Sequence, residues 1–294
     1  MAGDNAHTMN PFPPATWRLL HTPAQAGPLN MAIDEAILLA IAEKQAPPTL
    51  RFFAWEPPCL SLGYAQPVSD VDVAQLAECG WDLVRRPTGG RAILHTDELT
   101  YSVLAPMDEP RVLGGVIESY RQLSLGLLRG LELLGLSANA EKKTDGRRQT
   151  ADAAVHRPPS AVNPVCFEVP SDYEITANGH KLLGSAQVRK KGVVLQHGTL
   201  PLTGDIARIC EALVFETEAE RVEAKVRVRA RATTLETVLG TAPTWAEAAQ
   251  ALQSGFAQAL NLNFELGELS PLEQTHAQRL LEEKYGAQVW NERV

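Results

Sequence analysis

The sequence lacks several features that mark specialised classes of protein. No run of eighteen apolar residues occurs in the 294-residue chain, which argues against a transmembrane helix. Lys and Arg (27) are outnumbered by Asp and Glu (35), and the net charge of −8 argues against nucleic-acid binding, because no basic excess is available to neutralise phosphates. The four cysteines stand far apart, without a CxxC or CxxxC pair, at Cys59, Cys79, Cys166 and Cys210. This spacing argues against a metal site or a disulfide framework and favours a reducing cytoplasm.

A hydrophobic content of 45% allows a sizeable core, and the length suggests one main domain. Residues 1–14 are polar and proline-rich, without the apolar centre of a secretory signal, and we expect a disordered lead. Residues 15–204 form the expected core domain. A polar, charged, proline-containing stretch at 137–163 interrupts it and is expected to be a mobile surface loop. Residues 205–294 are expected to be mostly helical and to pack on the same domain.

The stretch Leu83–His95, with the sequence LVRRPTGGRAILH, is typical of a ligand-binding loop between two short strands. Adjacent glycines allow backbone conformations that other residues avoid and let the backbone approach a ligand closely. Successive N–H groups in such a turn suit a carbonyl, carboxylate or phosphate oxygen, and three arginines add positive charge beside it. The alternative is a plain hairpin turn with solvated arginines. The candidate binding residues of this loop are Arg86, Thr88, Gly89, Gly90, Arg91 and His95.

Earlier in the chain, a helix is predicted to begin at Asn30 and to run to about Lys44. Asn30 would be the N-cap, and Asp34 and Glu35 would lie in the first turn, where acidic side chains interact favourably with the helix dipole. Isoleucines at four-residue spacing predict one buried face, formed by Ile33, Ile37 and Ile41.

After residue 163 the pattern predicts an antiparallel meander. Asn178-Gly179 is a strong two-residue hairpin signal, and a second turn is expected at Lys190–Gly192. In the first hairpin Thr176 would face Lys181, and Ile175 would face Leu182. Small residues beside polar ones along the meander mark places where a ligand could lie close to the backbone, at Gly184, Ser185, His197 and Gly198.

Cys166 and Lys181 are the candidate catalytic pair. Cys166 lies at the junction between the polar stretch and the first hairpin, and an ammonium group near it would favour the nucleophilic thiolate. The alternatives are an inert core thiol and a solvated lysine. His197 is equally well interpreted as a structural histidine.

Four segments together resemble the lipoate/octanoate protein ligase and transferase family: RRPTGGRAILH, NGHKLLGSAQVRKKGVVLQHGTLPL, NMAIDEAI and the closing EKYGAQVWNERV. Within that family the chain is most similar to the cysteine-dependent octanoyltransferases. The resemblance implies an α+β fold with a biotin/lipoate ligase-like core, related to class II synthetases, in which antiparallel or mixed sheets are flanked by helices. The polar stretch at 137–163 departs from the family pattern.

The resemblance also implies an activity. Such enzymes move an octanoyl group from acyl carrier protein to a lysine of a lipoyl-accepting protein, either the glycine cleavage H protein or a dehydrogenase E2 lipoyl domain. Cys166 would carry the acyl group as a thioester and Lys181 would lower its pKa. The Arg86–His95 loop would line the acyl and carbonyl end of the site. No cofactor or metal is implied, and we expect a cytoplasmic monomer.

Two related activities stay open from the sequence. The family's ATP-dependent lipoate-protein ligases share most of these motifs, need ATP and Mg²⁺, and do without the cysteine. Lipoyl or octanoyl amidotransferases also use a cysteine. For the transferase, the donor carrier is typically acidic, so the candidate docking charges are those at the second turn: Arg189, Lys190 and Lys191. The alternative is a solvated turn.

Overall fold

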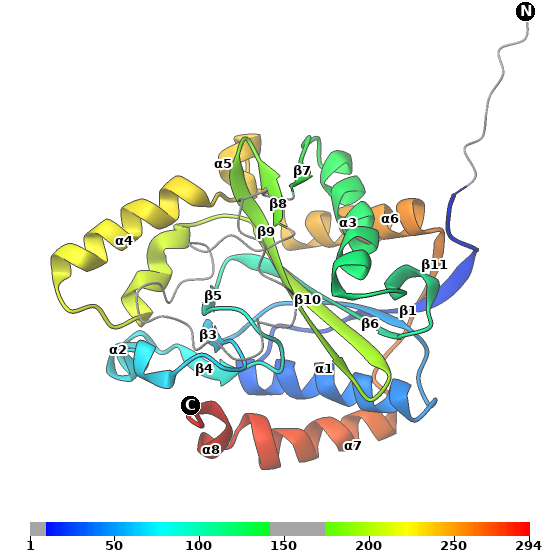
Figure 1. Cartoon of the computed structure of the whole chain (residues 1–294), viewed down its shortest axis with the longest axis horizontal. Helices are drawn as coiled ribbons and strands as arrows, with labels where there is room; N and C mark the ends of the chain where they lie inside the picture. Colours follow the sequence, from blue (N-terminus) through cyan, green and yellow to red (C-terminus); the bar gives the residue numbers. More distant parts are fainter. Residues whose placement is uncertain (1–9, 142–173) are drawn as a thin grey trace, which may run out of the picture.

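The structure is a computed structural model that describes residues 10–141 and 174–294. Within these ranges the chain forms a mixed sheet of eight strands, ordered β11-β1-β2-β6-β10-β9-β8-β7, and a separate sheet of three strands, ordered β4-β3-β5 (Figure 1). The strands of the large sheet are β1 (Ala15–His21), β2 (Thr49–Phe53), β6 (Glu98–Pro106), β7 (Asn139–Glu141), β8 (Glu174–Ala177), β9 (His180–Lys190), β10 (Val193–Pro201) and β11 (Leu262–Leu266). Those of the small sheet are β3 (Cys59–Leu62), β4 (Asp82–Arg85) and β5 (Ile93–His95).

Helices of very different length connect these strands. The α-helices are α1 (Gly27–Ala42), α2 (Val73–Cys79), α3 (Val116–Leu133), α4 (Glu218–Arg231), α5 (Leu235–Leu239), α6 (Trp245–Leu260), α7 (Pro271–Leu280) and α8 (Gln288–Asn291). Short 3-10 turns occur at η1 (Val68–Asp70), η2 (Pro110–Val112) and η5 (Ile206–Ala212), and η6 (Leu281–Tyr285) is a π-helical turn. No helix in the described ranges is long and apolar enough to cross a membrane.

Helices cover both faces of the large sheet (Figure 1). Helix α1 packs with α7 on one face, and its predicted stripe of Ile33, Ile37 and Ile41 is buried against β6 and β10. Helices α3 and α6 cover the other face and approach each other closely, because glycines occupy their contact: a Cβ on Gly255 would lie 2.3 Å from the amide nitrogen of Gly130. Mixed sheets flanked by helices confirm the expected α+β class.

The small sheet has a core of its own. Leucines of β3 pack with η5 and with α2 and α4, in a cluster that includes Leu60, Leu62, Leu76, Ile209 and Val228. The sheet is held against the rest of the molecule by a cluster that joins β2, β3 and α1 to the C-terminal Tyr285. The loop Leu83–His95 is therefore anchored on both sides by packed strands, β4 and β5.

Several local expectations were wrong. The end of the expected disordered lead is ordered: Phe12 is buried, and the Arg111 guanidinium donates to the Pro13 carbonyl oxygen, because the lead packs beside β11 and α6. Strand β7 lies within the expected loop and pairs with β8; the rest of that loop, 142–163, lies outside the described residues. The C-terminal part also supplies a strand, β11, which pairs in parallel with β1.

The start of α1 also differs from the prediction. The helix begins at Gly27, after Ala26, so that Asn30 lies inside the first turns and is fully buried. The Asn30 side-chain amide donates to the carbonyl oxygen of Ala54 at 2.9 Å, and its oxygen accepts from Arg51 at 2.7 Å. The polar group that resembled a local cap therefore makes tertiary contacts.

Candidate active site

A cavity of about 870 Å³ lies between the small sheet and strands β9 and β10 of the large sheet. Most of the predicted site residues line it, although they come from segments about a hundred residues apart. They are Arg86, Gly89, Gly90, Arg91, His95, Lys181, Gly184, Ser185, His197 and Gly198. Thr88 does not line the wall but hydrogen-bonds to His197, which does. Cys166 lies outside the described residues, so its pairing with Lys181 stays a prediction.

The Arg/Gly loop is not a hairpin. Strands β4 and β5 pair with opposite edges of β3, in parallel and antiparallel orientation, and the loop crosses between them. Gly90 has a φ of 95°, which favours glycine, and a Cβ on Gly63 would lie only 1.8 Å from the Gly90 carbonyl oxygen. Arg86 holds this shape, because its guanidinium donates to the carbonyl oxygens of Gly89 (2.9 Å) and Arg91 (2.7 Å). Gly90 therefore has the backbone conformation expected for a glycine of this loop, and the predicted contact between the loop and a ligand stays a prediction.

The adjacent Arg85 serves the fold instead of the cavity. Its side chain is fully buried and donates to the carbonyl oxygens of Gly63, Gln66 and Asn291. The Arg85 backbone N–H also donates to the side-chain oxygen of Asn291, at 2.8 Å. Arg85 thereby ties the C-terminal helix α8 to the loop, and only two of the three loop arginines line the cavity.

His197 is held in a chain of hydrogen bonds beneath the cavity. Its Nδ1 lies 3.4 Å from Asp34 Oδ2, and its Nε2 lies 2.7 Å from Thr88 Oγ1. Because the Asp34 carboxylate only accepts, the Nδ1 carries the hydrogen and Nε2 accepts from the Thr88 hydroxyl. Burial lowers the pKa of His197 and outweighs the opposing effect of Asp34, which keeps the imidazole neutral near pH 7.

Asp34 is itself tightly held. It accepts from the Arg51 guanidinium and from the Ser102 hydroxyl, both at 2.7 Å. Burial would raise the pKa of Asp34, but the charge of Arg51 and the hydrogen bonds from His197 and Ser102 together lower it. The carboxylate is thus ionised and locks both the histidine tautomer and the Thr88 end of the loop.

A second histidine is oriented in the same way on the opposite wall. His95 Nε2 lies 2.8 Å from Ser61 Oγ, and His95 Nδ1 lies 2.6 Å from Glu98 Oε1. The Trp55 ring stacks on the imidazole with a centroid separation of 3.9 Å, and its Nε1 donates to Thr100, which in turn donates to Glu98. The chain of contacts fixes the ring at the cavity wall.

Lys181 lies at the inner part of the cavity. Its side chain is 4% exposed, and its Nζ donates to Glu174 Oε1 at 2.7 Å. The predicted hairpin is confirmed: Asn178 and Gly179 form the turn with positive φ, and Thr176 pairs with Lys181. The neighbouring prediction was wrong, because a register irregularity places Ile175 opposite Leu183.

Three acidic residues that organise the site were not predicted as site residues. Asp34 and Glu98 orient the two histidines, and Glu174 contacts Lys181. For Asp34 the sequence held one signal: it lies in a mostly apolar helix, where an acidic side chain is seldom buried unless it is paired.

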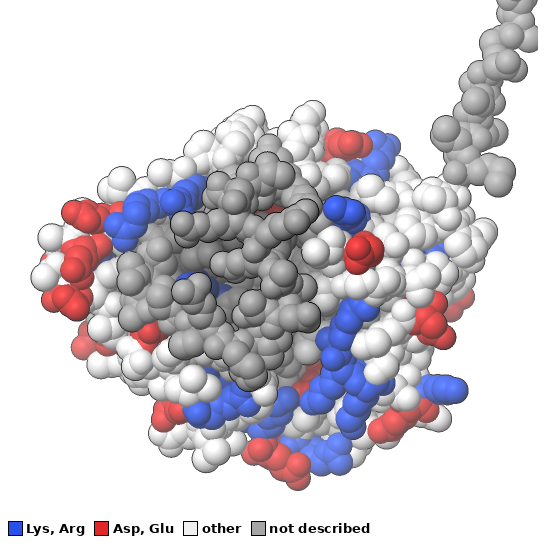
Figure 2. Space-filling view, viewed as in Figure 1, with Lys and Arg blue, Asp and Glu red and all other residues white. Residues whose placement is uncertain are grey.

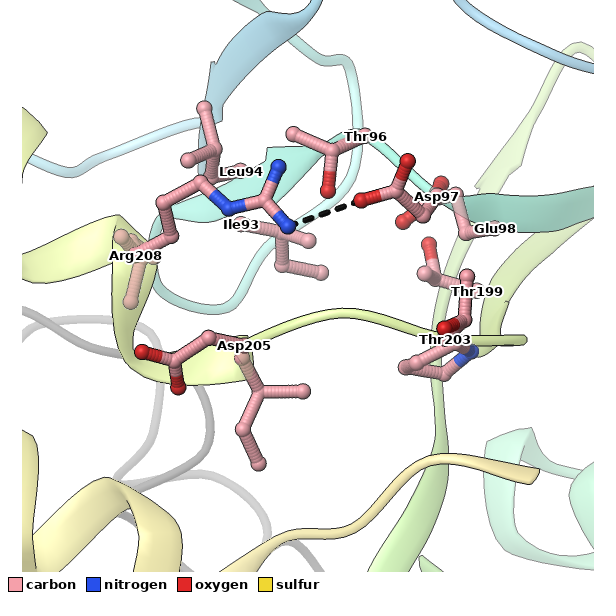
Figure 3. A pocket seen from close by; sticks show the side chains of 12 residues that line it. Ile93, Leu94, Thr96, Asp97, Glu98, Thr199, Thr203, Asp205 and Arg208 are labelled. Carbon is pink, nitrogen blue, oxygen red and sulfur yellow. Dashed lines mark hydrogen bonds and ion pairs between the residues drawn. The ribbon is translucent and has the colours of Figure 1, made fainter. Parts of the chain in front are cut away.

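A second, much smaller pocket lies nearby (Figure 3). Ile93 and Thr199 line both this pocket and the cavity. Its volume is about 30 Å³, and the ion pair between Arg208 and Asp97, at 2.8 Å, spans it. Such a space holds at most a few water molecules and offers no room for a substrate.

Comparison with known proteins identifies the family. The model of the lipoyl protein ligase A/B catalytic domain matches residues 27–257. The chain belongs to this family. The match spans the loop, both histidines and Lys181, so most of the cavity lining belongs to the family's catalytic domain; Lys284 and Trp290 line the cavity from beyond the matched residues.

Curated members of the lipoyl protein ligase A/B family match nearly the whole chain. Octanoyltransferase LipM of Symbiobacterium thermophilum is 44% identical and covers 94% of this chain and 98% of its own length. Octanoyltransferase LipM of Bacillus subtilis is 36% identical with the same coverage. The predicted family and its octanoyltransferase branch are therefore confirmed.

Solved structures of the family share the fold. A lipoate-protein ligase A bound with ATP has a TM-score of 0.76 at 23% identity and covers 95% of this chain and 99% of its own. A bipartite lipoate protein ligase from Thermoplasma acidophilum has a TM-score of 0.75 at 22% identity and covers 94% and 96%. At such identities the likeness shows the fold alone, and the predicted ligase-like fold is confirmed.

Proposed function

We propose that this chain is an octanoyltransferase of protein lipoylation, which moves an octanoyl group onto a lysine of a lipoyl-accepting protein. The relatives named octanoyltransferase, which match over nearly their whole length, support the acyl group and the reaction class. The structural observation that carries the proposal is the buried ammonium of Lys181 in the wall of a large cavity, beside two histidines of fixed orientation and a glycine loop.

The proposed reaction has two acyl-transfer steps. The Cys166 thiolate attacks the thioester carbonyl of octanoyl-acyl carrier protein, and the carrier's thiolate leaves and takes up a proton. A neutral lysine amine of the acceptor then attacks the Cys166 thioester, loses a proton and forms an amide while the Cys166 thiolate is released. A thioester is higher in free energy than an amide, so neither ATP nor another cofactor is required.

The described residues supply the surroundings for these steps. The Lys181 ammonium favours the thiolate form of Cys166. Backbone N–H groups of the Gly89-Gly90 loop, held by Arg86, are candidates to stabilise the oxyanion, an effect of about 3–4 kcal/mol per well-placed donor. Asp34 and Thr88 engage both ring nitrogens of His197. Glu98 and Ser61 engage both ring nitrogens of His95, so the two imidazoles form fixed parts of the cavity wall.

The acyl chain needs an apolar surface, and the cavity provides one. Apolar side chains from α1, from the segment after β2, and from β5 and β9 line it: Met31, Trp55, Ile93, Ala186 and Val188. Burying the seven carbons of the octanoyl tail there would contribute roughly 5 kcal/mol, at about 0.8 kcal/mol for each methylene.

We further propose acyl carrier protein as the donor and, as the acceptor, a glycine cleavage H protein or a dehydrogenase E2 lipoyl domain. A nucleophilic thiol works best where it stays reduced, so we place the reaction in the cytoplasm, with the chain acting as a monomer.

Intact-protein mass spectrometry after mixing the chain with octanoyl-carrier protein, without ATP, tests the proposal. We expect an octanoyl adduct that hydroxylamine removes, that maps to Cys166 and that is absent from Cys166→Ala. Cys79→Ala is the matched control, because Cys79 is an exposed cysteine outside the cavity, and it should keep the adduct. If no adduct forms and lipoyl-adenylate appears once ATP and lipoate are supplied, the chain is a ligase and the proposal fails.

A further inference from the structure

Positively charged side chains line the cavity, although the chain as a whole carries a net charge of −8. Lys and Arg side chains line it at six positions, and no Asp or Glu does so within the described residues. The six are Arg86, Arg91, Lys181, Arg189, Lys190 and Lys284. An octanoyl thioester is uncharged at its reacting end and apolar along its tail. The acyl group alone therefore gives no reason for so much positive charge, and the charge indicates an anionic part of the ligand.

Two of the lining lysines form one cluster with an arginine, and we call it the rim cluster: Lys190, Lys284 and Arg293. Lys284 and Arg293 both lie over the ring of Trp290, which lines the cavity. The Lys190 side chain is 46% exposed, whereas that of Lys181 is 4% exposed, so the rim cluster lies at the open end of the cavity. Figure 2 shows Lys and Arg side chains gathered over the lower ends of β9 and β10 and the segment that leads to α8.

The rim cluster holds more positive charge than its own carboxylate balances. Glu35 binds both Lys190, at 2.7 Å, and Lys284. Arg293 stacks over the rings of Tyr64 and Trp290, with its guanidinium carbon 3.8 and 4.3 Å from their centroids. The pKa of Lys284 is lowered, mainly by burial and further by the charges of Lys190 and Arg293, although Glu35 acts to raise it. The three cations are therefore close enough to repel one another.

The distance from the rim cluster to Lys181 restricts the ligand. Lys181 folds along its own strand, since a Cβ on Gly184 would lie 3.5 Å from Lys181 Nζ. Lys190 lies six positions after Gly184 along β9, a backbone span of about 20 Å at 3.3 Å per residue. The ligand must therefore place its anionic group far from its reacting carbonyl. In an acyl adenylate the phosphate is bonded directly to that carbonyl, so its phosphate would lie at Lys181 and leave the rim cluster unused.

We propose that the rim cluster binds the phosphodiester of a pantetheine arm, whose far end carries the acyl thioester to Lys181. This inference rests on the proposed octanoyl transfer and deepens it. The donor is then recognised by the phosphate of its prosthetic arm, and the rings of Tyr64 and Trp290 hold the Arg293 guanidinium in place for it.

Two small donors that differ only in the phosphate test the proposal: octanoyl-pantetheine and octanoyl-4′-phosphopantetheine. We expect the wild type to prefer the phosphorylated donor in kcat/KM by about tenfold to a hundredfold, the effect of hydrogen bonds between charged groups. Arg293→Met should reduce that preference at least severalfold, through a lower kcat/KM for octanoyl-4′-phosphopantetheine. Lys190→Met should also reduce the preference and serves as a second variant. Lys44→Met is the matched control, because Lys44 is an exposed lysine at the far end of α1, and it should keep the preference.

A binding measurement separates failure of this inference from failure of the proposed function. Calorimetry with free phosphopantetheine and pantetheine needs no turnover. If no octanoyl transfer occurs but phosphopantetheine still binds more tightly, and Arg293→Met removes the difference, the rim cluster site stands and the transferase fails. If transfer proceeds and both donors are used equally well, the rim cluster proposal is overturned and the transferase stands. Weakened binding of octanoyl-adenylate by Arg293→Met would likewise overturn it.

Discussion

Asp34→Asn should destabilise the fold more than any change to an exposed ion pair. Asp34 and Arg51 are both fully buried, and their side chains meet at 2.7 Å beneath the cavity. The substitution keeps the shape of the side chain but removes its charge, which leaves a guanidinium in the interior without its carboxylate. Removing one partner of a buried ion pair costs about 3–5 kcal/mol, a large share of the about 5–15 kcal/mol by which a domain is stable.

Thermal unfolding followed by circular dichroism measures this effect. At about 2–4 °C per kcal/mol, Asp34→Asn should lower the Tm by about 6–20 °C. The matched control is Asp205→Asn, which removes the same charge from the exposed pair with Arg229. An exposed pair contributes about 0–1 kcal/mol, so this control should shift the Tm by only a few degrees. A Tm for Asp34→Asn no lower than that of the control would refute the reasoning.

The same pair predicts a pH dependence and a rescue. The folded-state pKa of Asp34 is lowered, so its contribution to stability is present above the unfolded-state pKa and is lost as the pH falls through the folded-state value. The unfolding free energy of Asp34→Asn should therefore fall less steeply in acid than that of the wild type.

Adding Arg51→Met to Asp34→Asn should recover part of the lost stability, because both charges are then absent. A double variant less stable than Asp34→Asn would contradict the pairing.

Three further predictions follow from other contacts. Lys181→Met should lower the rate of acyl-adduct formation at neutral pH at least tenfold and recover partly at higher pH, where the thiolate forms without help; an unchanged pH–rate profile would contradict its role. Gly255→Ala should destabilise by several kcal/mol in urea unfolding, because the added Cβ would lie 2.3 Å from the Gly130 amide nitrogen, while the neighbouring Ser254→Ala should stay within about 0.5 kcal/mol. Glu35→Gln should flatten the loss of stability between pH 4.5 and 2 in acid titrations, because hydrogen bonds from Lys190, Lys284 and Tyr285 overcome burial and lower the pKa of Glu35 to about 2.

Patterns within a short stretch of sequence predicted local structure well. The Asn178-Gly179 turn requires two positive φ angles, which these residues tolerate, and the hairpin forms there with Thr176 opposite Lys181. The isoleucine stripe of α1 is buried as its spacing indicates. One step further along the hairpin the register prediction failed, because the irregularity between Ile175 and Thr176 is a response of the strand to its surroundings and has no local signal.

Three polar residues of α1 make tertiary contacts that the local sequence did not predict. Asn30 has the chemistry of a cap and Asp34 that of a first-turn acid, yet both are buried and both bind Arg51 from β2. These side chains could have interacted with the start of their own helix or with another element. Because α1 packs on the sheet, they hydrogen-bond to Arg51 instead. Glu35 is likewise buried and reaches Tyr285, 250 residues away in the chain.

The sequence by itself determined the family, the hairpins and the glycine loop, because each depends on residues that are neighbours in the chain or on motifs that recur in relatives. Only the tertiary structure decided how the cavity is built. His197 and Asp34 are 163 residues apart, His197 and Thr88 are 109 apart, and Lys190 and Glu35 are 155 apart. Contacts at such separations depend on the order and register of the strands, which local periodicity does not specify. The carboxylates that hold the histidines therefore became visible only once the chain was folded. Lys190 was a candidate docking charge from the sequence, but only the fold placed it beside Lys284 and Arg293.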